Sequence, residues 1–193
     1  MAERLGVFGG TFDPPHVGHL VVAVNVRFDL DLDRVLMVVA HDPWQKSGSR
    51  DVSTADDRLA MCQAAVGDVD GLEVSDLEIR RGGVSYTADT LSELRDEDPT
   101  RELFLIVGSD AAASLPTWDR VDEVKDLATI VIVTRPGAVE EQPPPGWDWV
   151  RVETPRLEVS STDLRARVAD GRPLDYLLTP SVIDSIAGRG LYR

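Results

Sequence analysis

Short apolar runs, rich in β-branched residues, recur along the chain and alternate with stretches of helical spacing. The runs lie at residues 5–8, 34–40, 72–74, 103–107 and 129–133. Several of them, such as Leu103-Phe-Leu-Ile-Val, show little alternation between apolar and polar positions. That pattern is typical of strands that are covered on both faces in a parallel sheet. We therefore expect parallel strands at these positions.

The stretches between the runs predict helices at residues 19–29, 55–66, 88–95 and 121–127, and a C-terminal helical piece from about residue 161. Ser53 and Thr54, followed by Asp56 and Asp57, form a polar pattern that starts a helix. Such alternation of strands and helices predicts an α/β doubly wound sheet with right-handed crossovers. A Pro- and Gly-rich excursion at 135–146 follows the fifth run, and residues 147–152 could return as a further strand.

Length, charge and cysteine content narrow the range of functions. We expect one domain over residues 1–193, with a helical C-terminal part at 160–193. The formal net charge of −14 argues against nucleic acid as a partner, because phosphate backbones require clustered Lys and Arg. We expect neither a membrane span nor a signal peptide, since no apolar run is long enough. The lone Cys62 has no disulfide partner and fits helix packing, so we expect a cytoplasmic protein.

The first expected strand runs into a segment that combines glycines, prolines and histidines, Gly9-Gly10-Thr11-Phe12-Asp13-Pro14-Pro15-His16-Val17-Gly18-His19-Leu20. Glycines directly after a strand let the backbone turn and approach a ligand closely. His16 and His19 lie three residues apart where the next helix should begin, so both imidazoles can face one point in its first turn. The N–H groups and dipole of a helix start attract anions. The segment therefore predicts an anion site at the carboxyl end of a strand, where open α/β sheets bind ligands.

Other functions of this segment have less support from the sequence. A histidine pair at this spacing could be half of a metal site, but no third Cys, His or carboxylate follows at ligand spacing. Two of the three histidines of the chain occupy this turn, which argues against chance placement on a surface. The P-loop pattern G-x-x-x-x-G-K-S/T is absent, and no G-x-G-x-x-G follows the first strand. Their absence weakens kinase, ATPase and dehydrogenase interpretations.

Residues 9–20 resemble the signature of the nucleotidylyltransferase superfamily, a Gly-rich turn followed by His-x-Gly-His. A second superfamily element, Ser-Ser-Thr-x-x-Arg, resembles Ser160-Ser161-Thr162-Asp163-Leu164-Arg165. Read physically, Ser161 or Thr162 can cap a helix while Arg165 reaches back toward phosphate oxygens. The resemblance implies an ATP site that is formed by Gly9, Gly10, Thr11, Phe12, His16, Gly18, His19, Gly108, Asp110, Ser160, Ser161, Thr162 and Arg165.

Further segments are similar to those of bacterial nicotinate-nucleotide adenylyltransferases. Tyr86-Thr87-Ala88-Asp89-Thr90 resembles their Tyr-Thr-x-Asp-Thr, and Gly108-Ser109-Asp110 with the later Trp118 resembles their Gly-Ser-Asp and Trp. Pantetheine-phosphate enzymes are shorter and typically carry Thr in place of His16. One loop departs from the pattern, because the family commonly has Pro-x-His-Lys where this chain has Pro43-Trp44-Gln45-Lys46. The resemblance implies an acceptor site that is formed by Lys46, Tyr86, Thr87, Asp110 and Trp118.

The resemblance also implies a fold and a reaction. The fold is a Rossmann-like parallel sheet of order 3-2-1-4-5 with a small C-terminal helical subdomain. The reaction moves AMP from ATP to nicotinate mononucleotide, giving nicotinate adenine dinucleotide and pyrophosphate in NAD biosynthesis. His19 would contact the α-phosphate, and His16, Arg165 and Lys46 would stabilise charge on the phosphates. Mg²⁺ would be held by the phosphates of ATP and not by protein side chains.

Alternatives of other classes remain open. A nucleotide-binding regulator without turnover would not need His16, His19 and Arg165 together. A pantetheine-phosphate type enzyme would share the ATP site and differ in its acceptor. An aminoacyl-adenylate module also carries His-x-Gly-His, but this chain lacks Lys-Met-Ser-Lys-Ser and is acidic. Pyrophosphate release with a panel of acceptors would separate these functions. The oligomeric state stays open, and a homo-oligomer is compatible with the sequence.

Overall fold

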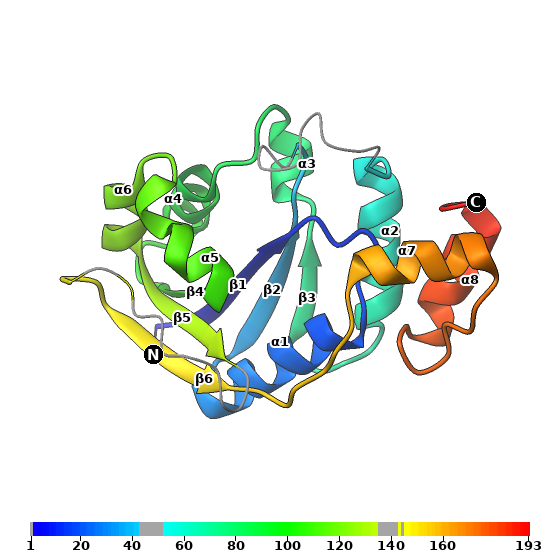
Figure 1. Cartoon of the computed structure of the whole chain (residues 1–193). Coiled ribbons are helices and arrows are strands. Elements are labelled where there is room, and N and C mark those ends of the chain that lie inside the picture. Colours follow the sequence, from blue (N-terminus) through cyan, green and yellow to red (C-terminus); the bar gives the residue numbers. More distant parts are fainter. Residues whose placement is uncertain (1, 43–51, 135–142, 144) are drawn as a thin grey trace.

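The computed structural model describes residues 2–42, 52–134, 143 and 145–193, and its centre is a six-stranded sheet (Figure 1). The strands are β1 (Arg4–Gly10), β2 (Arg34–Val39), β3 (Leu72–Ser75), β4 (Glu102–Gly108), β5 (Ala128–Thr134) and β6 (Trp149–Glu153). They lie in the order β3-β2-β1-β4-β5-β6, and each neighbouring pair is parallel. The expected order 3-2-1-4-5 is therefore confirmed, and β6 extends it where a further strand was predicted.

The helices are α1 (Val17–Asp29), α2 (Ala55–Val66), α3 (Leu77–Arg81), α4 (Thr87–Glu97), α5 (Ser109–Ser114), α6 (Val121–Leu127), α7 (Ser161–Asp170) and α8 (Pro180–Arg189), with a 3₁₀ turn η1 (Leu115–Thr117). Thr54 caps α2 by accepting from the N–H of Asp57, as its sequence predicts. The sequence did not predict α3, α5 and η1, because they are too short for a helical period to show. None of the helices in the described ranges is long and apolar enough to cross a membrane.

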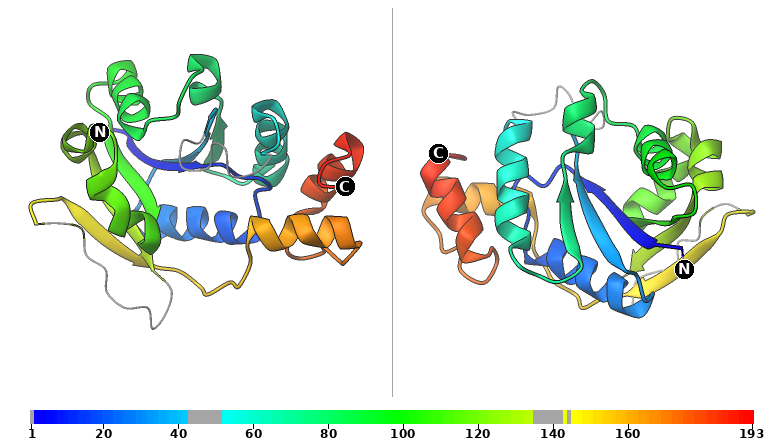
Figure 2. Two further views of the ribbon diagram at one scale, coloured as in Figure 1. Left: turned by 45° about the horizontal axis from the view of Figure 1, so that its top comes forward. Right: turned by 180° about the vertical axis from the view of Figure 1, so that it is seen from behind.

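Both faces of the sheet are covered, which explains the uninterrupted apolar runs. In β2, Leu36 and Val38 join one buried cluster, whereas Val35, Met37 and Val39 join another. The first cluster includes side chains of α3, α4, α5 and α6, and the second includes side chains of α1 and α2. Figure 2 shows the blue helix α1 and the green helix α4 on opposite sides of the strands.

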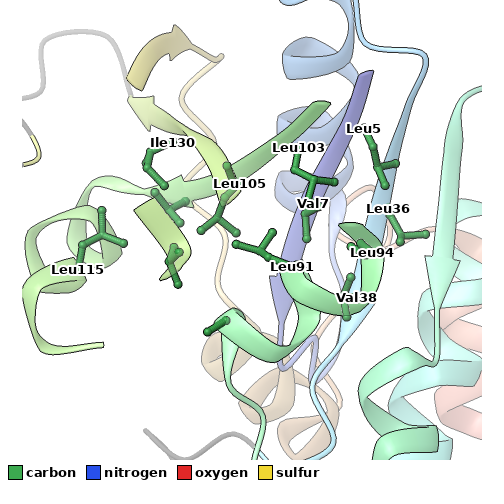
Figure 3. Close-up of a cluster of buried hydrophobic side chains, with 14 of the residues drawn as sticks. Leu5, Val7, Leu36, Val38, Leu91, Leu94, Leu103, Leu105, Leu115 and Ile130 are labelled. Carbon is green, nitrogen blue, oxygen red and sulfur yellow. The ribbon is translucent and has the colours of Figure 1, made fainter. Parts of the chain in front are cut away.

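Helix α4 is held on the sheet by large aliphatic side chains. Leu91 and Leu94 share a cluster with Val7, Leu36 and Leu105 of three strands (Figure 3). Each of the five is at most 6% exposed, and such burial contributes about 1.5–3 kcal/mol per side chain. This packing fixes the first turn of α4 beside the carboxyl ends of β1 and β4.

The two C-terminal helices pack on α2. Leu164 of α7 and Val182 and Ile186 of α8 share a cluster with Met61 and Ala65 of α2. Figure 1 shows α7 and α8, in orange and red, next to α2. The chain thus returns from β6 to the carboxyl end of β1, where α7 starts beside the first turn of α1. Segments from the two ends of the chain meet at this point.

Candidate active site

The start of α1 sets the tautomer of His19. His16 is the N-cap residue of α1, and its backbone N–H donates to Nδ1 of His19 at 3.1 Å. Because Nδ1 accepts this bond, the proton of a neutral His19 imidazole lies on Nε2. His19 is part of the wall of a cavity of about 180 Å³ at the carboxyl end of β1. The helix start therefore prepares His19 as a hydrogen-bond donor through Nε2.

His16 lies behind His19. The two rings stack with centroids 3.7 Å apart and an interplanar angle of 23°. They lie together as expected, but of the two only His19 is part of the wall of a described cavity. His16 is only 9% exposed, and burial lowers its pKa to about 4. Its Nδ1 has no hydrogen-bond partner among the described residues. His16 is thus a neutral ring at physiological pH, which supports His19 and adds no positive charge.

The low pKa of His16 predicts acid sensitivity of the fold. Between pH 6.5, the value for an unperturbed imidazole, and about 4, the unfolded chain binds more protons than the folded one. The free energy of unfolding therefore falls as the pH drops through this window. We expect His16 to account for about 2 kcal/mol of the loss between pH 7.5 and 5. Urea unfolding of the wild type and His16→Asn at both pH values checks this, and equal losses in the two proteins would contradict it.

The tight turn after β1 is made by Phe12 and not by the glycines. Phe12 has a positive φ of 49°, whereas Gly9 and Gly10 belong to β1, which corrects the expectation that the glycines turn the backbone. A Cβ on Gly10 would lie 2.7 Å from the ring of Phe12, so Gly10 provides room for that ring. Phe12 in turn meets the His19 ring edge-on, with centroids 5.0 Å apart, and thereby orients it.

Gly18 lets the C-terminal part approach the histidines. A Cβ at this position would lie 3.0 Å from both Nδ1 of His16 and Cγ1 of Val159. Such a distance is shorter than a normal carbon contact, so any larger residue would push one of these groups away. Val159 directly precedes Ser160, which begins the second predicted element. A glycine at position 18 is therefore explained by the close packing of His16 against Val159.

The second predicted element, residues 160–165, contacts the loop after β1. Arg165 donates from Nη1 to the main-chain carbonyl of Asp13 at 2.7 Å and from Nη2 to Oγ1 of Thr162 at 3.2 Å. The hydroxyl of Ser161 donates to the carbonyl of Pro14 at 2.8 Å, and Ser161 also lines the 180 Å³ cavity. The N-cap of α7 is Ser160, which accepts from an N–H of the first turn. The expectation that Ser161 or Thr162 is the cap is therefore wrong.

A larger cavity, of about 270 Å³, lies between β1 and β4. Its wall includes Gly9, Gly10, Thr11 and Gly108 at the strand ends, and Tyr86, Thr87 and Trp118 from the helical side. Tyr86 is the N-cap of α4, so the first N–H groups of this helix have no partner within it. The indole N–H of Trp118 donates to the hydroxyl of Ser114 at 3.2 Å, which fixes the ring plane.

The two cavities adjoin, because Phe8, Gly9, Gly10 and Thr11 line both of them. Their common wall is the carboxyl end of β1, next to the carboxyl end of β4. Most of the predicted site residues therefore gather at the predicted switch point of the sheet. Asp110 lies in α5 directly after β4. Lys46 and its neighbours at 43–51 lie outside the described residues.

Arg58 is a supporting residue that the sequence analysis missed. It lies on α2, is 1% exposed, and donates to the carbonyls of Ser53, Thr11 and His41, each at 3.0 Å. Burial lowers the pKa of its guanidinium, and the hydrogen bonds from its charged N–H groups compensate for lost hydration. Arg58 thus ties the loops after β1 and β2 to α2. The apolar residues that follow Arg58 in α2 were the one sequence feature that could have indicated its burial.

No group of three or more His, Cys, Asp or Glu side chains within the described ranges could hold a metal ion. Thr11, His19 and Ser161 supply neutral hydroxyl and imidazole groups to the smaller cavity, and Asp13 supplies its one carboxylate. Oδ1 of Asp13 already accepts from the hydroxyl of Tyr192 at 2.6 Å. Such a donor set suits phosphate oxygens better than it suits a cation held by the protein.

Comparison with known proteins gives one consistent family. The sequence model of the cytidylyltransferase-like family matches residues 7–167. A Corynebacterium kroppenstedtii protein named "probable nicotinate-nucleotide adenylyltransferase" is 45% identical over 192 residues, which cover 98% of this chain and 90% of the relative. A Streptomyces coelicolor protein of the same name is 46% identical over 186 residues, which cover 96% of this chain and 98% of the relative.

Solved structures show the same fold. The Plasmodium falciparum nicotinic acid mononucleotide adenylyltransferase complexed with NaAD superposes with a TM-score of 0.81 at 18% identity, covering 98% of this chain and 97% of that one. The same protein complexed with APC gives a TM-score of 0.78 at 17% identity, with the same coverage. At this identity the likeness concerns the fold alone.

Proposed function

Because this chain belongs to the cytidylyltransferase-like family, and within it to the nicotinate-nucleotide adenylyltransferases, we propose that it transfers AMP from ATP to nicotinate mononucleotide. The observation that carries this proposal is the pair of adjoining cavities along Phe8–Thr11. The smaller one, lined by His19 and Ser161, suits the phosphates of ATP. The larger one, lined by Trp118 and the start of α4, suits a flat ring that bears a carboxylate.

The reaction needs alignment more than proton transfer. An oxygen of the acceptor phosphate attacks the α-phosphorus of ATP, and the bond between this phosphorus and the bridging oxygen breaks, so pyrophosphate leaves with the electron pair. The attacking oxygen is already anionic, and no general base is required. Nε2–H of His19 donates to the α-phosphate, where negative charge shifts in the transition state. His16 supports that ring, and Arg165 and Lys46 bind the departing pyrophosphate.

Mg²⁺ belongs to the nucleotide in this proposal. The smaller cavity offers hydroxyl and imidazole groups and one carboxylate, Asp13, which already accepts from Tyr192, so Mg²⁺ would be held by the phosphates of ATP and not by the protein. When bound, Mg²⁺ neutralises part of the phosphate charge and leaves the protein residues to orient the oxygens.

The start of α4 and Trp118 are proposed to select the acid over the amide. A carboxylate on the pyridine ring would accept from the backbone N–H groups near Thr87, which have no partner within the helix. An amide would bring its own N–H₂ against these donors and lose charge-assisted bonds. The positive pyridinium ring suits the face of an indole, and Ser114 holds Trp118 in orientation.

We thus propose that this acidic protein, of net charge −14, binds two small anions, ATP and nicotinate mononucleotide. Local donors hold such ligands, whereas a nucleic acid would need a basic surface. The cytoplasm is the proposed compartment, since ATP is supplied there and the single Cys62 is a buried free thiol.

The direct test is product formation from a panel of acceptors. With ATP and Mg²⁺, we expect nicotinate mononucleotide to give nicotinate adenine dinucleotide and stoichiometric pyrophosphate, both measured by chromatography and a coupled assay. Nicotinamide mononucleotide should react more slowly, and phosphopantetheine should not react. Pyrophosphate with phosphopantetheine alone would favour the pantetheine-phosphate alternative. ATP binding without any product would favour the regulator.

Trp118→Ala should raise KM for nicotinate mononucleotide about tenfold, because stacking and cation–π attraction contribute about 0.5–2 kcal/mol. KM for ATP should stay nearly unchanged, because Trp118 lines only the larger of the two described cavities. Ser114→Ala removes the bond to the indole and should have a smaller effect in the same direction. Equal damage to both KM values with a lower melting temperature would instead make Trp118 a packing residue.

A further inference from the structure

Asp13 is a carboxylate placed where phosphates are expected to bind. It lines the 180 Å³ cavity together with His19 and Ser161, and it is 1% exposed. A buried carboxylate at this place opposes the binding of an anion unless its charge is engaged by other groups. What engages Asp13 therefore bears on the affinity of the cavity for ATP.

The next-to-last residue of the chain supplies a donor for Asp13. The hydroxyl of Tyr192 donates to Oδ1 of Asp13 at 2.6 Å, across a separation of 179 residues. Burial, and then this hydrogen bond, raise the pKa of Tyr192, so the hydroxyl keeps its proton at physiological pH. The backbone of Tyr192 has a positive φ of 62°, a conformation that a non-glycine residue adopts when its surroundings hold it. The buried Arg58 interacts electrostatically with both Asp13 and Tyr192.

Arg58 is held by three main-chain carbonyls. Arg165 is therefore the cation that Asp13 would draw toward itself if its carboxylate lost the bond from Tyr192. Its Nη1 already donates to the main-chain carbonyl of Asp13 at 2.7 Å, so a small movement would bring its guanidinium to the side chain of the same residue. Guanidinium and carboxylate form two parallel bonds, which are stronger than a bond to a carbonyl. An Arg165 engaged in this way would be less able to bind the phosphates of ATP.

We propose that Tyr192 is a positioning residue whose hydroxyl engages the Asp13 carboxylate and thereby keeps Arg165 for the phosphates of ATP. The role of Arg165 rests on the proposed function, whereas the contact between Tyr192 and Asp13 does not. The C-terminal end of the chain is, on this basis, part of the structure that tunes ATP affinity. Tyr192 touches neither substrate and acts through Asp13.

The test compares Tyr192→Phe with Tyr176→Phe, which removes a hydroxyl from the same C-terminal part at a position that is 95% exposed. ATP binding is measured by titration calorimetry with Mg²⁺ and without acceptor, so it does not depend on turnover. We expect Tyr192→Phe to raise Kd for ATP about tenfold, the size of one lost hydrogen bond to a charged group. Tyr176→Phe should leave it unchanged, and KM for nicotinate mononucleotide should stay within about twofold in both.

A double-mutant cycle shows whether Tyr192 acts through Asp13. Asp13→Asn removes the charge that would compete for Arg165, so adding Tyr192→Phe to it should change Kd for ATP little further. If Tyr192→Phe alone does not fold, the double variant is expected to fold and to bind ATP like Asp13→Asn, which still tests the coupling. Additive effects of the two substitutions would overturn the proposal.

Other outcomes separate this inference from the proposed function. If the wild type makes no nicotinate adenine dinucleotide while Tyr192→Phe weakens ATP binding, the proposed function fails and the positioning role stands. If the wild type is active and Tyr192→Phe binds ATP like Tyr176→Phe, the positioning role is wrong. Equal losses of affinity for ATP and acceptor, together with a lower melting temperature, would mean that Tyr192 only holds the segment after α8 on the fold. That result would also overturn the positioning role.

Discussion

His19→Ala is expected to lower kcat about 10²–10⁴-fold, because it removes the proposed donor to the charge that develops on the α-phosphate. The structure adds a complication, since Nδ1 of His19 also accepts the N–H of His16 at 3.1 Å. The Ala variant therefore loses a helix cap as well, at a cost of about 1 kcal/mol of stability. A lower kcat in His19→Ala would therefore not show whether the lost helix cap or the lost phosphate donor is responsible.

A matched variant separates them. In His19→Asn the side-chain oxygen can take the place of Nδ1 and accept the N–H of His16, but no group replaces Nε2–H. We expect His19→Asn to recover the melting temperature that His19→Ala loses and to keep the low kcat. Steady-state kinetics with thermal unfolding of both variants measures this. If His19→Asn turned over at the wild-type rate, the imidazole would serve only to start α1.

The fold was predictable because local and global signals agree. After its first residue, each of β2 and β4 carries five consecutive apolar residues, since helices cover both faces of the sheet. This left one consistent interpretation of residues 34–40 and 103–107. The family that the motifs suggested is confirmed by relatives at 45% and 46% identity. Helices α3 and α5 escaped prediction because their five and six residues carry no measurable period.

The site was predictable where chemistry follows from spacing along the chain. His16 and His19 are such a case, because the N-cap of a helix and its third residue lie close together, and here their rings stack. The positive φ of Phe12 could not be predicted, since it depends on the ring packing over Gly10. The contacts of Arg58 and Tyr192 join segments that only the tertiary fold brings together, and so no local pattern reports them.

The loop after β1 is buried over residues 11–16, with Phe12 in a hydrophobic cluster, and donors hold its main-chain carbonyls from several sides. Arg58 binds the carbonyl of Thr11, Arg165 that of Asp13 and Ser161 that of Pro14. A loop fixed in this way requires less ordering when ligand binds, and fixed dipoles are what transition-state stabilisation needs. Of these three side chains, Arg165 is also proposed to bind the phosphates of ATP.

Arg165→Ala is expected to lower kcat/KM for ATP by about 10²-fold, since it removes both the proposed phosphate ligand and a bond to the loop. Arg165→Lys should recover only part of this loss. A guanidinium can donate to the Asp13 carbonyl at 2.7 Å and to Thr162 at 3.2 Å and still direct further N–H groups at phosphate, whereas an ammonium has three donors and no planar fork.

The matched control for Arg165 lies two residues further along the same helix. Arg167 pairs with Asp163 at 2.6 Å and donates to the carbonyl of Pro173 at 3.3 Å, whereas Arg165 donates to the loop after β1. Neither arginine is part of the wall of the two described cavities, so the contact with the loop is what distinguishes them. Arg167→Ala removes a positive charge from α7, as Arg165→Ala does, but should change stability little, because its ion pair is partly exposed to solvent, and should leave ATP kinetics unchanged. Steady-state kinetics with ATP varied at saturating acceptor gives the comparison. If both variants lose ATP use equally, the effect comes from the net charge of α7, and Ser160–Arg165 serves only to start a helix.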